Sequence, residues 1–493
     1  MFEIREDILE EYAALAVKTG VNVQKGQTVV ISAPVEAYKL ARKCGEVAYK
    51  CGAAKVSFDY YDDAKSLLDY TYIWFRRVCM FEIREDILEE YANLAVKTGV
   101  NVQEGQTVVI SAPVEAYKLA RKCGEVAYKC GAAKVSFDYY DDAKSLLDYT
   151  YMSLENLEKF PKWQVEKTAS LIEEGYCRIA IIGSDPDLLK GLDQEKIKAS
   201  RMARMKALAD YQYYFMNSVG QWTIVAYPEL NWAKKVFPEL SDEEAMNALW
   251  EAILMTSRVK LGETVDNWKK HDDELAKHCA LLNEYNFKSL HFKNSLGTDL
   301  TVGLIKNHIW QGGEEVASGM YKVPFNANIP TEEVFTMPDC YHIDGRVCST
   351  KPLSYGGKLI SSFELTFKDG KVVDYKAEDN EDVLKTILDT DEGSKSLGEV
   401  ALISYDSPIS NSGILFYDTL FDENASCHLA LGACYPTTVK DGEKISSEEL
   451  LKLGGNDSLN HVDFMFGSKD MSIIGETYDG QEVVVFKDGN FVF

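Results

Sequence analysis

A nearly identical internal repeat constrains the fold of this chain more than any other feature. Residues 1–72 recur at 80–151. The copies differ at two positions only, Ala14 against Asn93 and Lys25 against Glu104. Old solenoid units diverge while they keep a pattern, so this repeat indicates either a recent partial duplication or an artefact of the gene model. One copy fills the native place in a sheet, and the other must dock elsewhere, exchange with its twin, or stay partly disordered with an exposed strand edge.

The end of the first copy marks a domain boundary. It runs into Ile73–Cys79, a short apolar and basic segment that matches nothing in the second copy, which begins at its own Met80. A chain of 493 residues is too long for one ordinary core and implies two or three domains. We therefore predict a duplicated partial unit at 1–79, an α/β domain at 80–286 and an α+β metal-binding domain at 287–493.

Hydrophobic periodicity predicts the elements of each copy. In the second copy the pattern alternates between helix and strand, at 83–97, 106–112, 114–130 and 134–139. This order is that of a β-α-β unit behind a leading helix. Short apolar strands at 177–182 and 222–227 extend the alternation. Residues 80–286 are therefore predicted to form an α/β layer.

Strands dominate the chain from about Phe287 onward. Four Asp-Gly pairs punctuate this part, at Asp344-Gly345, Asp369-Gly370, Asp479-Gly480 and Asp488-Gly489. Asp-Gly is a strong signal for a hairpin turn, because both residues tolerate the positive φ angles that the tightest hairpins need. The sequence therefore predicts an α+β domain with much antiparallel pairing.

The net charge of −25 excludes some classes of partner. Nucleic acids and anionic membranes need clustered basic surface, so neither is expected to bind. The chain starts with acidic residues and lacks the apolar core of a signal peptide, and no apolar run reaches the roughly 18 residues of a membrane span. A cytoplasmic location is the resulting expectation.

Six side chains of the metal-ligand type form three short clusters in the second half of the chain. They are one Glu of the pair Glu332-Glu333, Glu399, Glu423, His428, His461 and Asp463. Two divalent ions about 3.5 to 4 Å apart need a bridging carboxylate and further acidic or imidazole ligands, and this set can supply both. Solvated acidic residues and packed histidines give the same pattern, so spacing alone leaves both interpretations open.

Ligand chemistry and local pattern refine this hypothesis. Mixed imidazole and carboxylate ligands favour zinc, cobalt or manganese over calcium. His461 and Asp463 lie two apart in an apolar stretch that predicts a strand, so both side chains project from one face. His428 is predicted to lie on a helix. Glu332 is predicted to point away from Glu333 and to support it.

Two further histidines, His271 and His278, lie in the charged segment His-Asp-Asp-Glu-Leu-Ala-Lys-His. The segment has a helical pattern, and a solvated helix face is a simpler interpretation than a second metal site. Both side chains are therefore expected on the solvated face.

Five motifs identify a known family. They are Asn-Ile-Pro-Thr-Glu-Glu-Val-Phe-Thr at 328–336, Ser-Thr-Lys-Pro-Leu at 349–353, Leu-Asp-Thr-Asp-Glu-Gly at 388–393, Leu-Gly-Glu-Val-Ala-Leu at 397–402, and Phe-Tyr-Asp-Thr-Leu-Phe-Asp-Glu-Asn-Ala-Ser-Cys-His at 416–428. Together they resemble the thermophilic-type metalloaminopeptidases, the family of aminopeptidases T, S and II. The resemblance spans Met80 to Phe493.

The resemblance implies a dinuclear site with six protein ligands. These are Glu333, Glu399, Glu423, His428, His461 and Asp463. The two divalent ions would be zinc or cobalt, with magnesium or manganese as alternatives, and Glu399 would bridge them. Tyr435 would assist catalysis, as a donor to the developing oxyanion.

The resemblance also implies the activity. The expected reaction is hydrolysis of the N-terminal residue of a peptide by a metal-activated water. The substrates would be peptides with a free N-terminus, and the enzyme would be a homodimer. Two alternatives stay open, another dinuclear metallohydrolase such as a phosphoesterase and a non-catalytic metal-binding homologue. Residues 1–79 contain none of the predicted ligands, so their loss should leave the chemistry intact.

Overall fold

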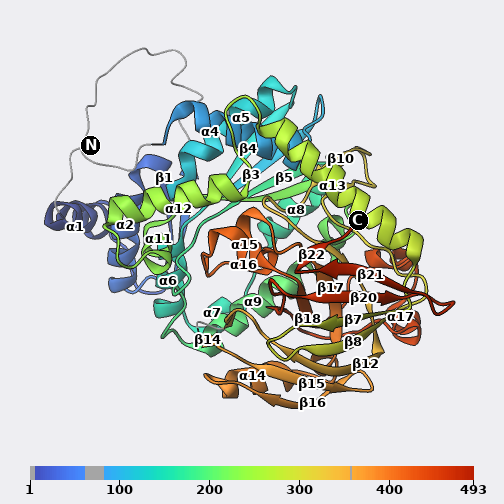
Figure 1. The fold of residues 1–493 in the computed structure, drawn as a ribbon. Coiled ribbons are helices and arrows are strands. Elements are labelled where there is room, and N and C mark those ends of the chain that lie inside the picture. Colours follow the sequence, from blue (N-terminus) through green and yellow to red (C-terminus); the bar gives the residue numbers. More distant parts are fainter. Residues whose placement is uncertain (1–5, 62–82, 356–357) are drawn as a thin grey trace. The chain divides into compact units, whose positions relative to one another are not determined.

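The computed structural model describes residues 6–61, 83–355 and 358–493. The chain divides into two compact units. The first comprises Met1–Leu254, Val259–Thr264 and Val316–Ala327, and the second comprises Met255–Arg258, Val265–Glu315 and Asn328–Phe493. Both mix helices and strands (Figure 1). The predicted linker Ile73–Cys79 and the start of the second copy at Met80 lie outside the described residues.

The second repeat copy forms the predicted β-α-β unit. It contains α4 (Glu85–Asn93), β3 (Thr107–Pro113), α5 (Tyr117–Lys129) and β4 (Lys134–Tyr140). Strand β3 pairs in parallel with β4 and with β5 (Cys177–Ile182), and β6 (Trp222–Ala226) continues the sheet. Val108, Ile110 and Ala112 of β3 are fully buried, as is typical of a central strand in a parallel sheet.

Several helices connect or follow these strands. They are α6 (Asp142–Tyr151), α7 (Leu154–Leu157), α8 (Lys162–Glu173), α9 (Gln194–Leu208), α10 (Tyr213–Met216), α11 (Leu230–Val236) and α12 (Asp242–Thr256). The predicted alternation of helices with short parallel strands is therefore present in the second copy and the residues that follow it.

The first copy has the same elements in a different environment. They are α1 (Glu6–Ala14), β1 (Thr28–Pro34), α2 (Tyr38–Lys50) and β2 (Lys55–Tyr61). Strands β1 and β2 form a parallel sheet of their own. Val30 of β1 is 66% exposed, whereas its twin Val109 in β3 is 3% exposed. The first copy thus docks outside the parallel sheet β4-β3-β5-β6, which is one of the three predicted outcomes.

An eight-stranded antiparallel sheet dominates the second unit. Its order is β16-β15-β12-β8-β7-β20-β21-β22, with β16 at one edge in Figure 1. The strands are β7 (Ser289–Lys293), β8 (Asp299–Leu304), β12 (Pro338–Cys348), β15 (Glu364–Lys368), β16 (Lys371–Lys376), β20 (Ser472–Glu476), β21 (Glu482–Lys487) and β22 (Asn490–Phe491). Phe292, Leu300 and Ile343 are fully buried in its core.

Three of the four predicted Asp-Gly turns are confirmed, at Asp369-Gly370, Asp479-Gly480 and Asp488-Gly489. The prediction for Asp344-Gly345 is wrong, because this pair lies inside β12. Gly345 has a φ of 122°, and a Cβ atom there would lie 2.2 Å from the carbonyl oxygen of Asp299 in β8. The glycine therefore permits close approach of a neighbouring strand and does not make a turn.

A smaller antiparallel sheet in the same unit has the order β11-β17-β18-β19. Its strands are β11 (Val334–Thr336), β17 (Leu397–Leu402), β18 (His428–Gly432) and β19 (His461–Met465). The prediction that His428 lies on a helix is wrong, since His428 begins β18. Every residue of β18 is buried, so its apolar run shows no alternation that would distinguish a strand from a helix.

The helices of this part are α13 (Thr264–Tyr285), α14 (Glu381–Leu388), α15 (Pro408–Ser412), α16 (Thr419–Asp422) and α17 (Ser447–Leu453). Across the described residues, no helix combines the length and apolarity that crossing a membrane requires. The sheet β11-β17-β18-β19 and the short helix α16 position the predicted metal ligands.

Candidate metal centre

Predicted ligands lie on one face of the antiparallel sheet β11-β17-β18-β19. Glu399 of β17 is opposite Ala430 of β18, and Ala430 is opposite Asp463 of β19. Directly opposed residues project from the same face of a sheet, as do residues two apart along a strand. His428 and His461 therefore share the face of Glu399 and Asp463. The small side chain of Ala430 leaves space among these longer ones.

Glu333 reaches the same cluster from the neighbouring strand. It immediately precedes β11, in which Phe335 is opposite Ala401 of β17. Glu333 Oε2 lies 3.1 Å from His428 Nε2. The structure thus brings together side chains that are 95 residues apart in the sequence.

Glu399 is shared by two groups of potential metal ligands. The first group is Glu333, Glu399 and His428, and the second is Glu399, His461 and Asp463, with the ligand atoms of each group within 4.8 Å of one another. Glu399 Oε1 lies 3.3 Å from His428 Nε2, while Glu399 Oε2 lies 3.6 Å from His461 Nε2. His461 Nε2 is also 3.4 Å from Asp463 Oδ1.

Buried negative charge dominates the electrostatics of this centre. Burial raises the pKa of Glu399, and repulsion from Glu333 and Asp463 adds to that rise, against a hydrogen bond from His428. Burial, followed by repulsion from Asp463 and Glu333, also holds the pKa of Glu423 well above its ordinary value. A divalent cation relieves such repulsion, so the donor set fits a metal ion.

The orientation of His461 also fits a metal ligand. Its Nδ1 lies 2.7 Å from the carbonyl oxygen of Ala433. A hydrogen bond to a backbone carbonyl assigns the proton to Nδ1 and leaves Nε2 to donate its lone pair, which is typical of metal-binding histidines. Burial opposes protonation of the metal-free imidazole, but the hydrogen bond to Asp463, the charges of Asp463 and Glu399 and the hydrogen bond to Ala433 together raise the pKa of His461 to about 9.

Glu423 approaches the cluster from outside the sheet. It follows α16 and begins a turn of 3-10 helix, Glu423–Ala425. It belongs to neither of the two ligand groups. The charges of Asp463 and Glu333 nevertheless raise the pKa of its carboxylate, after the larger effect of burial, so these three groups interact electrostatically.

Tyr435 lies beside the second ligand group. Its ring centroid is 4.8 Å from that of His461. Burial raises the pKa of the Tyr435 hydroxyl, and Glu399 and Asp463 raise it further. The hydroxyl therefore keeps its proton at neutral pH and can donate a hydrogen bond.

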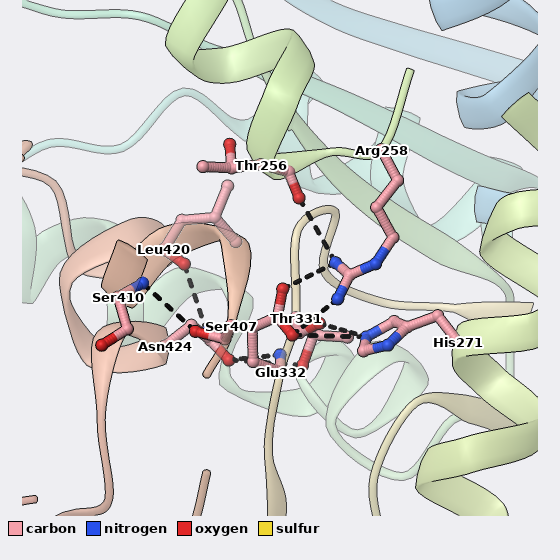
Figure 2. Close-up of polar contacts among 9 residues, drawn as sticks. All are labelled: Thr256, Arg258, His271, Thr331, Glu332, Ser407, Ser410, Leu420 and Asn424. Atoms are coloured by element: carbon pink, nitrogen blue, oxygen red, sulfur yellow. Dashed lines mark hydrogen bonds and ion pairs between the residues drawn. The ribbon is translucent and has the colours of Figure 1, made fainter. Parts of the chain in front are cut away.

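A buried polar network holds the residue that precedes Glu333 (Figure 2). Arg258 donates hydrogen bonds to both carboxylate oxygens of Glu332, at 2.6 and 2.8 Å. The backbone N–H of Glu332 donates to Asn424 Oδ1 at 2.8 Å. Asn424 directly follows Glu423, so this side chain connects the two segments that contain the predicted ligands Glu333 and Glu423. These contacts agree with the predicted supporting role of Glu332.

The prediction of a solvated helix face is wrong for both His271 and His278. They are 7% and 8% exposed, and they lie seven residues apart on the same side of α13. His271 Nε2 lies 2.7 Å from the carbonyl oxygen of Thr331, which brings it into the network of Figure 2. The ring of His278 stacks on Phe491, with 4.0 Å between the centroids.

Sequence reasoning also missed Arg258 and Asn424. Nothing near Arg258 in the sequence signals its role, because its partner is 74 residues away. Asn424 had a signal, since it adjoins a predicted ligand in the motif Glu423-Asn424.

Replacing Arg258 by methionine is expected to lower the free energy of unfolding by about 3 to 5 kcal/mol, because Glu332 would remain buried without its cation. The matched control is Arg346→Met, which breaks an ion pair between Arg346 and Glu364 in which the arginine side chain is 50% exposed. An exposed pair should cost less than about 1 kcal/mol. Urea unfolding measures both. Equal losses in the two variants would contradict the structural importance of the buried pair.

Comparison with known proteins assigns the family. The sequence profile described as thermophilic metalloprotease (M29) matches residues 5–77 and 84–491. Aminopeptidase AmpS of Bacillus subtilis is 47% identical over 406 residues, which are 82% of this chain and 98% of that protein. Aminopeptidase 2 of Geobacillus stearothermophilus is 44% identical over 409 residues, 83% of this chain and 98% of that protein.

A solved structure agrees with this assignment. Wild-type AmpT from Thermus thermophilus is similar to this chain with a TM-score of 0.77 and 40% sequence identity, over 83% of this chain and 99% of that one. The similarity thus extends over nearly the whole length of these relatives. The chain therefore belongs to the thermophilic metalloprotease (M29) family and is a metalloaminopeptidase.

Proposed function

We propose that this enzyme hydrolyses the N-terminal residue of peptides at a dinuclear metal site. One observation carries the proposal, the position of Glu399 with one carboxylate oxygen toward His428 and the other toward His461. A carboxylate shared by two ligand groups is the arrangement that a two-metal hydrolytic site requires. The names of the relatives support peptides with a free N-terminus as substrates.

The proposed site uses both ligand groups and Glu423. Its ligands are Glu333, Glu399, Glu423, His428, His461 and Asp463. All six lie in the catalytic domain proposed at 287–493. Nitrogen and oxygen donors of this kind suit zinc or cobalt, and magnesium or manganese are the alternatives. That the enzyme acts as a homodimer in the cytoplasm remains a prediction.

When bound, the two ions supply Lewis acidity, which activates a water and polarises the scissile carbonyl. Residues of the chain orient the metal ligands and the reacting groups. The hydrogen bond from His461 Nδ1 to Ala433 fixes the imidazole plane. The protonated hydroxyl of Tyr435 donates a hydrogen bond to the carbonyl oxygen as negative charge develops there.

Turnover of chromogenic substrates tests this function. The full chain and a chain starting at Met80, each stripped of metal and refilled with zinc or cobalt, should cleave leucyl anilide at similar rates. N-acetyl-leucyl anilide, which lacks a free amino terminus, and phenyl phosphate serve as controls. Cleavage of phenyl phosphate alone would favour a phosphoesterase, and bound metal without any turnover would favour a non-catalytic homologue.

Removal of the metal is expected to abolish turnover and to destabilise the protein. Carboxylates buried together repel one another, and ions that bind only the folded state stabilise it by about 4 kcal/mol at a thousandfold excess over Kd. Thermal unfolding with and without a chelator measures this effect, and re-addition of the metal should reverse it. An unchanged Tm after complete metal loss would contradict a buried site of this kind.

A further inference from the structure

Reciprocal ion pairs join the two repeat copies. Arg42 Nη2 of the first copy lies 2.6 Å from Glu115 Oε1 of the second. Arg121 of the second copy pairs in turn with Glu36 of the first. At an offset of 79 residues, Arg121 is the twin of Arg42 and Glu115 is the twin of Glu36. Contact of residue i with j, and of j with i, is the property of a twofold interface.

An apolar cluster between the copies has the same symmetry. Val35 and its twin Val114 are both fully buried in this cluster. Two further pairs of twins contribute aromatic rings to it, Tyr38 with Tyr117 and Tyr60 with Tyr139. A residue and its twin can lie in one small cluster only near the rotation axis that relates the copies. The cluster therefore marks the axis.

A buried carboxylate makes this contact specific. The side chain of Asp141 in the second copy is 1% exposed. It accepts hydrogen bonds from Arg42 Nε at 2.8 Å and from the hydroxyl of Tyr60 at 2.7 Å, both in the first copy. A buried charge is costly when its partners are absent, so the two copies fit one another in this orientation.

Helix α6 (Asp142–Tyr151), the last element of the second copy, completes the core of the first. Leu147 packs against the cluster that contains Val47 and Val56. The hydroxyl of Tyr49 donates a hydrogen bond to Asp148 at 2.5 Å, and its ring stacks on Tyr151 with 5.2 Å between the centroids. The first copy thus packs on its twin over an extended surface that includes the last helix of the twin.

We propose that this surface of the repeat unit is self-complementary and that its partner is a second copy of the same unit. In the full chain the first copy fills the surface within one molecule. A chain that starts at Met80 keeps Val114, Glu115 and Arg121 without the first copy. Two such chains pair through the same contacts, with Arg121 of each against Glu115 of the other. The first copy converts this interface between chains into an internal one.

Sedimentation of two chains tests the pairing. The relatives match only about four fifths of this chain yet nearly all of their own length, so a chain starting at Met80 has the extent of a whole family member. We expect each particle formed by the shorter chain to contain twice as many chains as a particle formed by the full chain at equal concentration. Arg121→Glu in the shorter chain should reverse the doubling. Equal particle sizes, or a doubling that Arg121→Glu leaves intact, would overturn the proposal.

Hydrogen exchange of the full chain tests the symmetry. Arg42→Glu and Arg121→Glu should each raise amide exchange in α2 and α6 by at least about tenfold, and by similar factors, because the two arginines are twins. The controls are Lys50→Glu and Lys129→Glu, another pair of twins, which pair with Glu10 and Glu89 inside their own copies. Effects of the arginine variants no larger than those of the controls would overturn the twofold interface. Circular dichroism confirms that each variant is folded.

Discussion

Replacing Glu399 by alanine is expected to lower kcat/KM by roughly 10³-fold or more, equivalent to about 4 kcal/mol of transition-state stabilisation. It should also reduce the metal content of the protein from the proposed two ions per chain to one or none. Each oxygen of this carboxylate faces a different imidazole, so its loss affects both ligand groups at once. Metal analysis by mass spectrometry and turnover of leucyl anilide measure the two effects.

Two further variants distinguish the loss of a metal ligand from a general loss of structure. Glu399→Gln preserves the size of the side chain while removing its charge, and it should lose metal nearly as severely as the alanine variant. Glu378→Ala removes an exposed carboxylate from the same unit and should change neither metal content nor kcat/KM. Two bound ions and ordinary turnover in Glu399→Gln would mean that Glu399 does not bridge the metals.

The second large effect is expected from Tyr435→Phe. Loss of one donor to a developing oxyanion costs roughly 10² to 10³ in kcat, about 2.7 to 4 kcal/mol. The raised pKa of Tyr435 means that its hydroxyl keeps the proton throughout the neutral range, so the lost interaction is a hydrogen bond and not a charge. The decrease should be in kcat, with KM and metal content unchanged.

A structural role for Tyr435 would give a different result. The ring packs against His461, and phenylalanine preserves that contact. Tyr341→Phe is a suitable control, because Tyr341 donates a hydrogen bond to the carbonyl oxygen of Leu451 on an exposed part of the same unit. If Tyr435→Phe lowers metal content or leaves kcat at the level of Tyr341→Phe, the hydroxyl does not act on the oxyanion.

The ligand face could be predicted in part from strand geometry. The spacing of His461 and Asp463 places both on one face wherever that stretch is a strand, and β19 has this form. The alignment of Glu399 with Asp463 depends on the register of β17, β18 and β19, which local sequence does not encode. His428 was assigned to the wrong element because burial on both sides removes the alternation that reveals a strand.

The supporting network could not be predicted for a different reason. Arg258 and His271 meet the segment Thr331-Glu332 over 74 and 60 residues of sequence. A helix segment rich in charges normally faces water, and the pattern around His271 is of that kind. Tertiary contacts override it here, because the carbonyl oxygen of Thr331 offers the imidazole a buried hydrogen-bond partner.

The repeat shows how far a local pattern determines structure. In the part of both copies that the structure describes, from 6 to 61 and from 85 to 140, helices and strands begin and end at equivalent residues, so the pattern determines them in either place. The burial of those elements is not determined locally, because identical strands lie in a four-stranded sheet in one copy and in a two-stranded sheet in the other. Three arrangements of the extra copy were consistent with its sequence, and only its tertiary contacts distinguish them.

That difference in burial means that the two copies should tolerate different amino-acid substitutions. Selection on β3 must preserve side chains that fill a core, so a substitution of Val109 by a polar residue would be eliminated. A polar residue at Val30 of β1 meets mostly water and should be neutral. In descendants of this gene, amino-acid changes should therefore accumulate first along the outer side of β1, while Arg42 and Glu36 are retained. The twins would then lose their resemblance in sequence long before they lose it in shape.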